Sequence, residues 1–287
     1  MAAAGHYNLS NIYKVFFCLV LAEFFFSCNP SNNETKIEPQ QQESSSAVLV
    51  PMINYSLVAK YPHDITSFTE GFLFFHDNLL ESTGAPDYLN KTKSAVGIAD
   101  LKTGEFKKKI ELDKKIYFGE GIIVMNDLLY QLTYTNQVVF VYDAKTFSRK
   151  AQFNYSNKEG WGMTTDGSSI IMSDGTEALS YINPSDFKTI KTLHVTENGF
   201  ALDHLNELEM INGFIYANVW MTQFIVKIDP NTGKVVGKLD LKDLYDDAKK
   251  ENINLLEMNG IAYHAKDDKI FITGKMWPFI YEIKFEH

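Results

Sequence analysis

The chain has 287 residues, a formal net charge of −9 and 14% aromatic residues. This length supplies one large all-β domain, or two smaller domains, with enough apolar material for a sizeable core. The mild acidity, uninterrupted by any block of lysine or arginine, argues against nucleic acid as a partner.

The first 28 residues differ in composition from the rest of the chain. Lys14 precedes an apolar run over residues 15–26, which is short for a membrane span and has the size of a signal-peptide core. The segment 1–28 is similar to a bacterial lipoprotein signal, in which Cys28 would become the acylated first residue. An ordinary secretory signal or an uncleaved anchor is the alternative, because Glu23 interrupts the apolar run.

The positions of the two cysteines and the composition of residues 29–50 support the same prediction of an exported protein. Cys18 and Cys28 are the chain's two cysteines, so the folded body contains no thiol, disulfide or cysteine-ligated metal. Residues 29–50 begin as a polar stretch rich in Asn, Gln, Glu and Ser, and we predict a flexible tether there. The sequence thus predicts an exported protein of the bacterial cell envelope, held at the membrane only through a lipid on Cys28, with its folded domain over residues 51–287.

Five later segments share one pattern, which is a strand, a polar turn and a returning strand. The starts of these hairpins recur every 41–52 residues, and two more strand patterns follow each of the first four hairpins. Four strands per repeat of this length are typical of a β-propeller. The predicted turns are Asp77-Asn78, Asn126-Asp127, Asp166-Gly167, Asn212-Gly213 and Asp267-Asp268.

The fifth repeat lacks one strand, because only residues 280–285 remain after its hairpin. Residues 54–61 form a spare strand before the first hairpin. We therefore predict an all-β fold, a five-bladed β-propeller with four antiparallel strands per blade, in which the N-terminal strand closes the last blade. Leu241, Leu244 and Ala248 follow helical spacing and predict one helical insert near the rim.

Propeller topology brings the residues before each hairpin and those that end each second strand to one mouth of the central channel. An aromatic pocket with carboxylates, an amide and a lysine is typical of a small-ligand site, while polar residues that only bind water are the alternative. The expected set includes Glu70, Glu120, Asn206, Asn259 and Lys275, together with the chain's three tryptophans, Trp161, Trp220 and Trp277.

Several other chemistries lack their sequence patterns. The seven histidines show no H-x-x-x-H or H-E-x-x-H spacing, which argues against a zinc site. Nucleophile-elbow, P-loop and dinucleotide-binding motifs do not occur. We therefore predict neither a metal nor a cofactor.

Motifs across the body resemble those of the plant and bacterial type of glutaminyl cyclases, five-bladed propellers unrelated to the zinc-dependent animal enzymes. The resemblance spans roughly residues 63–283. Its motifs include Phe68-Thr69-Glu70-Gly71, Phe118-Gly119-Glu120-Gly121, Gly160-Trp161-Gly162, Leu205-Asn206-Glu207-Leu208 and Gly274-Lys275-Met276-Trp277.

The resemblance implies a glutaminyl-peptide cyclotransferase, which converts an N-terminal glutamine of a peptide or protein into pyroglutamate and releases ammonia without a metal. By the family's pattern, Glu120 would be the general acid and base, and Asn206 and Lys275 would contact the reacting amide. The substrate-binding residues would be Phe68, Glu70, Phe118, Tyr134, Trp161 and Trp220.

Three positions depart from that pattern. The family usually has Gln at position 70, Trp at position 134 and Gln at position 221, where this chain has Glu70, Tyr134 and Met221. Losing a side-chain amide donor and gaining a second carboxylate at position 70 would either alter how the substrate is held or raise the pKa of Glu120 by like-charge repulsion. Tyrosine keeps an aromatic wall and adds a hydroxyl group.

Two other functions remain open at this point. Oxygen donors such as Glu70, Glu120, Asn206 and Asn259 would also suit a calcium-dependent, lactonase-like propeller hydrolase. A non-catalytic surface propeller that binds peptides or glycans is the second alternative. We expect a monomer, because nothing in the sequence marks an interface.

Overall fold

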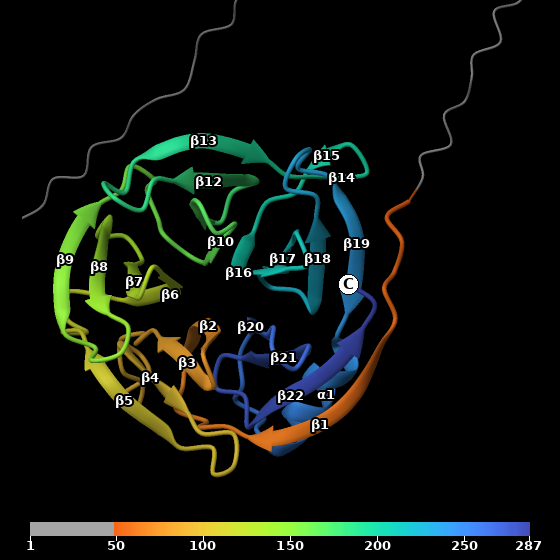
Figure 1. Cartoon of the computed structure of the whole chain (residues 1–287). Helices are drawn as coiled ribbons and strands as arrows, with labels where there is room; N and C mark the ends of the chain where they lie inside the picture. The colour runs from red at the N-terminus through yellow and green to blue at the C-terminus, as the bar shows by residue number, and fades with distance from the viewer. Residues whose placement is uncertain (1–48) are drawn as a thin grey trace, which may run out of the picture. The chain divides into compact units, whose positions relative to one another are not determined.

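The computed structural model describes residues 49–287. The predicted signal, Cys28 and nearly all of the predicted tether lie outside the described residues. Five four-stranded antiparallel sheets surround a common centre in Figure 1. The prediction of a five-bladed β-propeller is therefore confirmed.

Each of the first four blades uses four consecutive strands, numbered outwards from the centre. Blade one contains β2 (Thr69–Phe75), β3 (Asn78–Thr83), β4 (Ala95–Ala99) and β5 (Phe106–Glu111). Blade two contains β6 (Gly119–Met125), β7 (Leu128–Thr133), β8 (Val138–Asp143) and β9 (Arg149–Asn154). Blade three contains β10 (Met163–Thr165), β11 (Ile170–Met172), β12 (Ala178–Ile182) and β13 (Thr189–His194). Blade four contains β16 (Leu205–Ile211), β17 (Phe214–Val219), β18 (Phe224–Ile228) and β19 (Val235–Asp240).

The fifth blade closes the ring with the N-terminal strand, as the sequence predicts. Its inner strands are β20 (Met258–His264), β21 (Lys269–Gly274) and β22 (Phe279–Phe285), and β1 (Tyr55–Pro62) is its outer strand. The pairing of β1 with β22 is antiparallel and runs from Tyr55↔Phe285 to Pro62↔Phe279. The first and last strands of the described chain thus hold each other in place.

Two short hairpin turns show why the repeated hairpins can be recognised in the sequence. Asn126 and Asp127 both have positive φ, at 53° and 60°, and Asn212 and Gly213 follow at 47° and 82°. Such turns suit the twist of paired strands, and Asn, Asp and Gly tolerate that backbone conformation. The first hairpin differs from its prediction, because β3 already begins at Asn78 and the turn lies one residue earlier, at His76-Asp77.

Apolar side chains fill the spaces between neighbouring blades. Phe72 from blade one packs with Ala262 and Ile280 from blade five in one such cluster. The predicted helix is α1 (Lys242–Glu251), and its residues Leu244 and Ala248 are buried against blades four and five. A two-stranded ribbon of β14 (Thr196–Glu197) and β15 (Phe200–Ala201) was not predicted. None of the helices among residues 49–287 has the length and apolarity to cross a membrane.

Glycines allow the inner strands to approach one another closely around the channel. The amide of Gly121 donates to the carbonyl of Trp161 at 2.7 Å, which joins blade two to blade three. A Cβ atom at Gly121 would lie 2.5 Å from that carbonyl oxygen, and one at Gly162 would lie 2.2 Å from the carbonyl oxygen of Asn206. Both contacts are with backbone atoms, so any larger residue would push the blades apart.

Candidate active site

Four of the five inner strands carry an irregularity in strand pairing near their first residues. Register shifts occur between Thr69 and Gly71 in β2, Gly119 and Ile122 in β6, Leu205 and Leu208 in β16, and Met258 and Ile261 in β20. A bulge re-aims the side chains at its position, and bulges are common beside active sites. The residues inside these shifts include Glu70, Glu120, Asn206 and Asn259.

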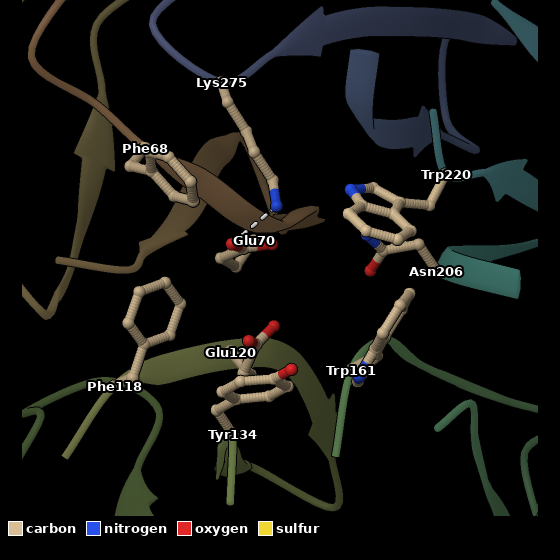
Figure 2. A pocket seen from close by; sticks show the side chains of 9 residues that line it. All are labelled: Phe68, Glu70, Phe118, Glu120, Tyr134, Trp161, Asn206, Trp220 and Lys275. Carbon is tan, nitrogen blue, oxygen red and sulfur yellow. Dashed lines mark ion pairs between the residues drawn. The ribbon is translucent and has the colours of Figure 1, made fainter. Parts of the chain in front are cut away.

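A pocket of about 220 Å³ opens at this end of the channel. Figure 2 shows the side chains converging on one space. The nine residues that the sequence analysis named for catalysis or substrate binding all line it: Phe68, Glu70, Phe118, Glu120, Tyr134, Trp161, Asn206, Trp220 and Lys275.

Aromatic rings form the walls of the pocket on two sides. Trp161 and Trp220 meet edge to face, with ring centroids 5.6 Å apart and an interplanar angle of 82°. Phe68 and Phe118 meet at 5.9 Å and 88°, and Tyr134 continues this wall 6.0 Å from Phe118. Walls of this kind exclude water and strengthen the electrostatic interactions inside the pocket.

The polar end of the pocket contains a buried ion pair. Nζ of Lys275 lies 2.8 Å from Oε1 of Glu70, and Nδ2 of Asn259 donates to the other carboxylate oxygen at 3.1 Å. The ammonium also lies 4.7 Å from the ring centroid of Phe68, within cation–π range. The Glu70 carboxylate is thus held on both oxygens, and the lysine keeps further N–H donors for a ligand.

Glu120 faces this pair without a hydrogen-bond partner of its own. Its backbone carbonyl accepts from Oγ of Ser82 at 2.6 Å, which fixes the main chain. Within residues 49–287 no hydrogen bond reaches its carboxylate, and the buried Oδ1 atom of Asn206 likewise has no partner. Buried polar atoms are normally paired, so two open groups facing one pocket indicate a polar ligand.

Burial raises the pKa values of both carboxyl groups, and the negative charge of Glu70 adds to the rise at Glu120. Burial raises the pKa of Glu70 to about 7, although Lys275 opposes the rise. The pKa of Glu120 stands well above its ordinary value, mainly because of burial and then because of the negative charge on Glu70. Burial alone would lower the pKa of Lys275, but the two carboxylates outweigh it and raise that pKa. Proton transfer near neutral pH is therefore within the reach of this site.

Comparison of the sequence and the structure with known proteins identifies the family of this chain. A family model described as glutamine cyclotransferase matches residues 32–285. This chain belongs to the glutamine cyclotransferase family. It is 36% identical over 249 residues to a glutaminyl-peptide cyclotransferase of Arabidopsis thaliana, covering 86% of this chain and 76% of the relative. It also resembles the crystal structure of Myxococcus xanthus glutaminyl cyclase, with a TM-score of 0.74 and 30% identity, over 82% of this chain and 98% of that one.

The pocket of this glutamine cyclotransferase family member is poorly suited to the predicted calcium alternative. The ammonium of Lys275 already occupies the position beside Glu70 that a cation would need. Asn259 turns its Nδ2 group, not its oxygen, towards the same carboxylate. In the described part of the chain, no group of three or more His, Cys, Asp and Glu side chains is arranged to hold a metal ion.

One residue expected at the mouth lies elsewhere. Trp277 is fully buried, donates from Nε1 to the carbonyl of Leu256 at 3.1 Å, and packs against Tyr281. The chain turns sharply at Met276, where φ is 60°, so Lys275 enters the pocket while Trp277 enters the core. The expectation that all three tryptophans meet at the mouth is therefore wrong for Trp277.

Two buried polar residues, Asn259 and Glu207, support the site from outside the pocket. Asn259 lies behind Glu70 and holds its carboxylate, as described above. Glu207 accepts backbone N–H groups from Phe72 at 3.2 Å and Ile261 at 2.9 Å, and so connects blade four to blades one and five. Met221, one of the three departures from the family's pattern, is 64% exposed and does not line the pocket.

One carboxylate next to the pocket, that of Glu159, was not predicted from the sequence. Oε2 of Glu159 accepts a hydrogen bond from Nε1 of Trp161 at 2.8 Å and fixes the indole ring. The pKa of Tyr134 on the facing wall is raised, mainly by burial and in addition by the negative charge of Glu159. The only sequence signal was its place two residues before Trp161, which gives no direction for the side chain.

Proposed function

We propose that this protein is a glutaminyl-peptide cyclotransferase that converts the N-terminal glutamine of peptides or proteins into pyroglutamate and releases ammonia. One observation carries the proposal. An unpartnered carboxylate, Glu120, faces the buried Lys275–Glu70 pair inside an aromatic pocket of a size suited to one side chain. Membership of the glutamine cyclotransferase family supports the same conclusion.

The reaction joins two groups of one residue, so positioning supplies much of the rate. The α-nitrogen must attack the carbon of the side-chain carboxamide, which requires the glutamine to fold back on itself. The walls formed by Trp161, Trp220 and Phe118 would hold the side chain in that conformation and exclude water. Fixing reacting groups in a near-attack geometry removes several kcal/mol from a barrier, up to roughly 7–11 kcal/mol in the best cases.

Glu120 is suited to carry the proton. The α-ammonium group of a peptide has an ordinary pKa of about 7.7–8.0, and its nitrogen can attack only in the neutral form, after one proton has been lost to solvent. The Glu120 carboxylate would accept the next proton, which this nitrogen loses as the new C–N bond forms. It would then return the proton to the departing amide nitrogen as the old C–N bond breaks, so ammonia leaves and the carboxyl group is regenerated as a carboxylate.

Lys275 and Asn206 are placed to bind the reacting amide. The N–H groups of Lys275 that do not engage Glu70 would stabilise the negative oxygen of the tetrahedral intermediate. The open Oδ1 of Asn206 would accept an N–H from the substrate and orient it. These contacts require no metal, and we propose that turnover is independent of one.

Ammonia release from glutamine peptides tests the function directly. The purified protein should release ammonia from a peptide that begins with Gln, and from no matched peptide that begins with Asn or Glu. Turnover should survive EDTA, and added calcium should not raise it. A folded protein that releases no ammonia from any glutamine peptide would overturn the proposal, and loss of activity in EDTA with recovery in calcium would favour the metal-dependent alternative.

We also propose export and lipid anchoring through Cys28, and a monomeric state. These proposals rest on the sequence, because the leader lies outside the described residues. Mass spectrometry of the mature N-terminus should find an acylated Cys28 as the first residue. Unmodified cleavage at another position would contradict the anchor, and light scattering that gives twice the mass of one chain would contradict the monomer.

A further inference from the structure

A second cavity, of about 590 Å³, lies next to the candidate active site. Trp161 and Trp220 line both cavities, so the two spaces share an indole wall. The remaining lining of the second cavity comes from the β9–β10 connection, the chain after β11 and His204: Ser156, Asn157, Lys158, Glu159, Asp174, Gly175, Thr176 and His204.

The aromatic part of this cavity offers flat faces to a ligand. The ring of His204 stacks on Trp220, with centroids 5.6 Å apart and an interplanar angle of 22°. Trp161 stands edge to face with Trp220 and is fixed by its hydrogen bond to Glu159. Rigid indole faces attract cations and the apolar stems of long side chains.

The two carboxylates of the cavity differ in how they are occupied. Asp174 accepts from Asn157 at 2.8 Å through one oxygen and from Thr176 at 2.6 Å through the other. Glu159 accepts the Trp161 N–H on one oxygen at 2.8 Å, and its carboxylate also interacts with the hydroxyl group of Tyr134. Within residues 49–287 no lysine, arginine or histidine forms an ion pair with Glu159, including its exposed neighbour Lys158. Its charge is therefore half-buried and without a counter-ion.

The location of the Glu159 carboxylate suits contact with the part of the substrate that follows the glutamine. When the glutamine occupies the first pocket, the rest of the peptide must leave past the pocket wall. The second cavity lies across the indole rings of Trp161 and Trp220 and is open enough to receive a long side chain. Lys275 and Glu70 do not line the second cavity, so the way from the first pocket into it leads past the shared indole wall.

We propose that the second cavity is a subsite for the residue that follows the N-terminal glutamine, and that it favours arginine or lysine there. The proposal rests on the proposed cyclotransferase function. A guanidinium group would pair with Glu159 and stack on an indole ring, and arginine should be preferred over lysine because its planar group does both. Glu159 is thus a specificity-determining residue.

Three peptides that differ only in the second residue test the subsite. The full chain is assayed for ammonia release with Gln-Arg, Gln-Ala and Gln-Glu peptides of otherwise identical sequence. We expect kcat/KM for the Gln-Arg peptide to exceed that for the Gln-Glu peptide by roughly tenfold or more, which is the effect of one charge-assisted hydrogen bond. The Glu159→Gln variant should reduce this ratio to within about twofold of unity.

The control variant removes a negative charge elsewhere. Asp87 is exposed in the β3–β4 connection and lines neither cavity. Asp87→Asn should therefore leave the Gln-Arg to Gln-Glu ratio unchanged. Equal kcat/KM for the three peptides, or a preference that survives Glu159→Gln, would overturn the subsite and leave the proposed function intact.

A binding measurement separates the subsite from the chemistry. If no glutamine peptide released ammonia, the proposed function would fall, and the subsite would be judged by the quenching of tryptophan fluorescence with the same three peptides. Binding of the Gln-Arg peptide that is at least about tenfold tighter, and that weakens in Glu159→Gln, supports the subsite. Equal affinities for the three peptides would overturn it.

Discussion

Nζ of Lys275 lies 2.8 Å from Oε1 of Glu70, and the two side chains are only 8% and 2% exposed. This ion pair means that one ammonium serves two buried carboxyl groups, because Glu120 faces the same space. Fully ionised, the three groups would carry a net negative charge in an aromatic pocket. Burial raises the pKa values of both Glu70 and Glu120, and the negative charge of Glu70 adds to the rise at Glu120. A glutamine at position 70 would not add that repulsion.

Glu120→Gln should abolish most of the turnover without unfolding the protein. The amide cannot accept the α-amine proton, so we expect kcat to fall by roughly 10²–10⁴-fold. The melting temperature should stay equal or rise, because burial penalises the carboxylate that is removed. Ammonia release and thermal unfolding measure the two effects. Glu105→Gln is the control, because Glu105 has an exposed carboxyl group in the connection after β4. A folded Glu120→Gln protein with normal turnover would exclude Glu120 as the acid and base.

Glu70→Gln should move the acidic limb of the pH profile to lower pH. Glu120 must be deprotonated to accept a proton, so activity rises with pH through its pKa. Removing the charge of Glu70 takes away repulsion and frees Lys275 to interact with Glu120, and both effects lower the pKa of Glu120. We expect the limb of kcat/KM to move down by about one pH unit, which corresponds to about 1.4 kcal/mol.

A more distant carboxyl group provides the control for that shift. Glu257 acts on Glu70 but is not among the causes that raise the pKa of Glu120. Glu257→Gln should therefore move the acidic limb much less than Glu70→Gln. An acidic limb that stays in place, or moves to higher pH, in Glu70→Gln would show that the limb does not report Glu120.

Much of this fold could be predicted because its signals are local and repeated. Asn126-Asp127 and Asn212-Gly213 mark tight turns by residue type alone, and the strands beside them are apolar and β-branched. Once five such hairpins are recognised, propeller topology brings their first residues together. The nine lining residues of the pocket could be named from the sequence for this reason, together with the family resemblance.

The remainder depended on tertiary contacts that leave no local pattern. The turn at Met276 is fixed by its backbone N–H, which donates to the carbonyl of Ser67 at 2.7 Å. That contact with the start of blade one decides that Lys275 faces the pocket and Trp277 the core. The hydrogen bond between Glu159 and Trp161, and hence the second cavity, likewise depends on how a loop is placed by its neighbours.

Stability should fall as pH rises from about 4.5 to about 8, in part because of Glu209. This carboxyl group is buried in β16 and accepts the N–H of Tyr263 at 2.8 Å, and burial raises its pKa from 4.5 to about 8. The folded state therefore holds a proton across a range where the unfolded state has lost it. One such group makes the free energy of unfolding fall by up to about 1.4 kcal/mol per pH unit within that window.

Glu209→Gln should flatten this dependence. Glutamine retains an oxygen for the N–H of Tyr263 but has no proton to lose, so the variant should gain stability relative to the parent protein as pH rises towards 8. Urea unfolding at pH 5 and pH 8 measures the difference. Glu105→Gln should leave the pH dependence unchanged, and an equal slope in Glu209→Gln would show that Glu209 does not titrate in this range.

Gly162→Ala should damage both the ring and the site. Its Cβ would lie 2.2 Å from the carbonyl oxygen of Asn206 and 2.7 Å from Cα of Glu207, so blade three must move away from blade four. Overpacking of this kind costs about 1–3 kcal/mol, and the displaced Asn206 should lower kcat even at temperatures where the variant is folded.

Gly167→Ala is the matched control, because Gly167 lies in the β10–β11 turn with φ of 85° and nothing within 4 Å of its would-be Cβ. It should lose about 1–2 kcal/mol of stability from its left-handed backbone and keep full turnover. Equal turnover in the two alanine variants would show that the close approach of blades three and four does not position Asn206.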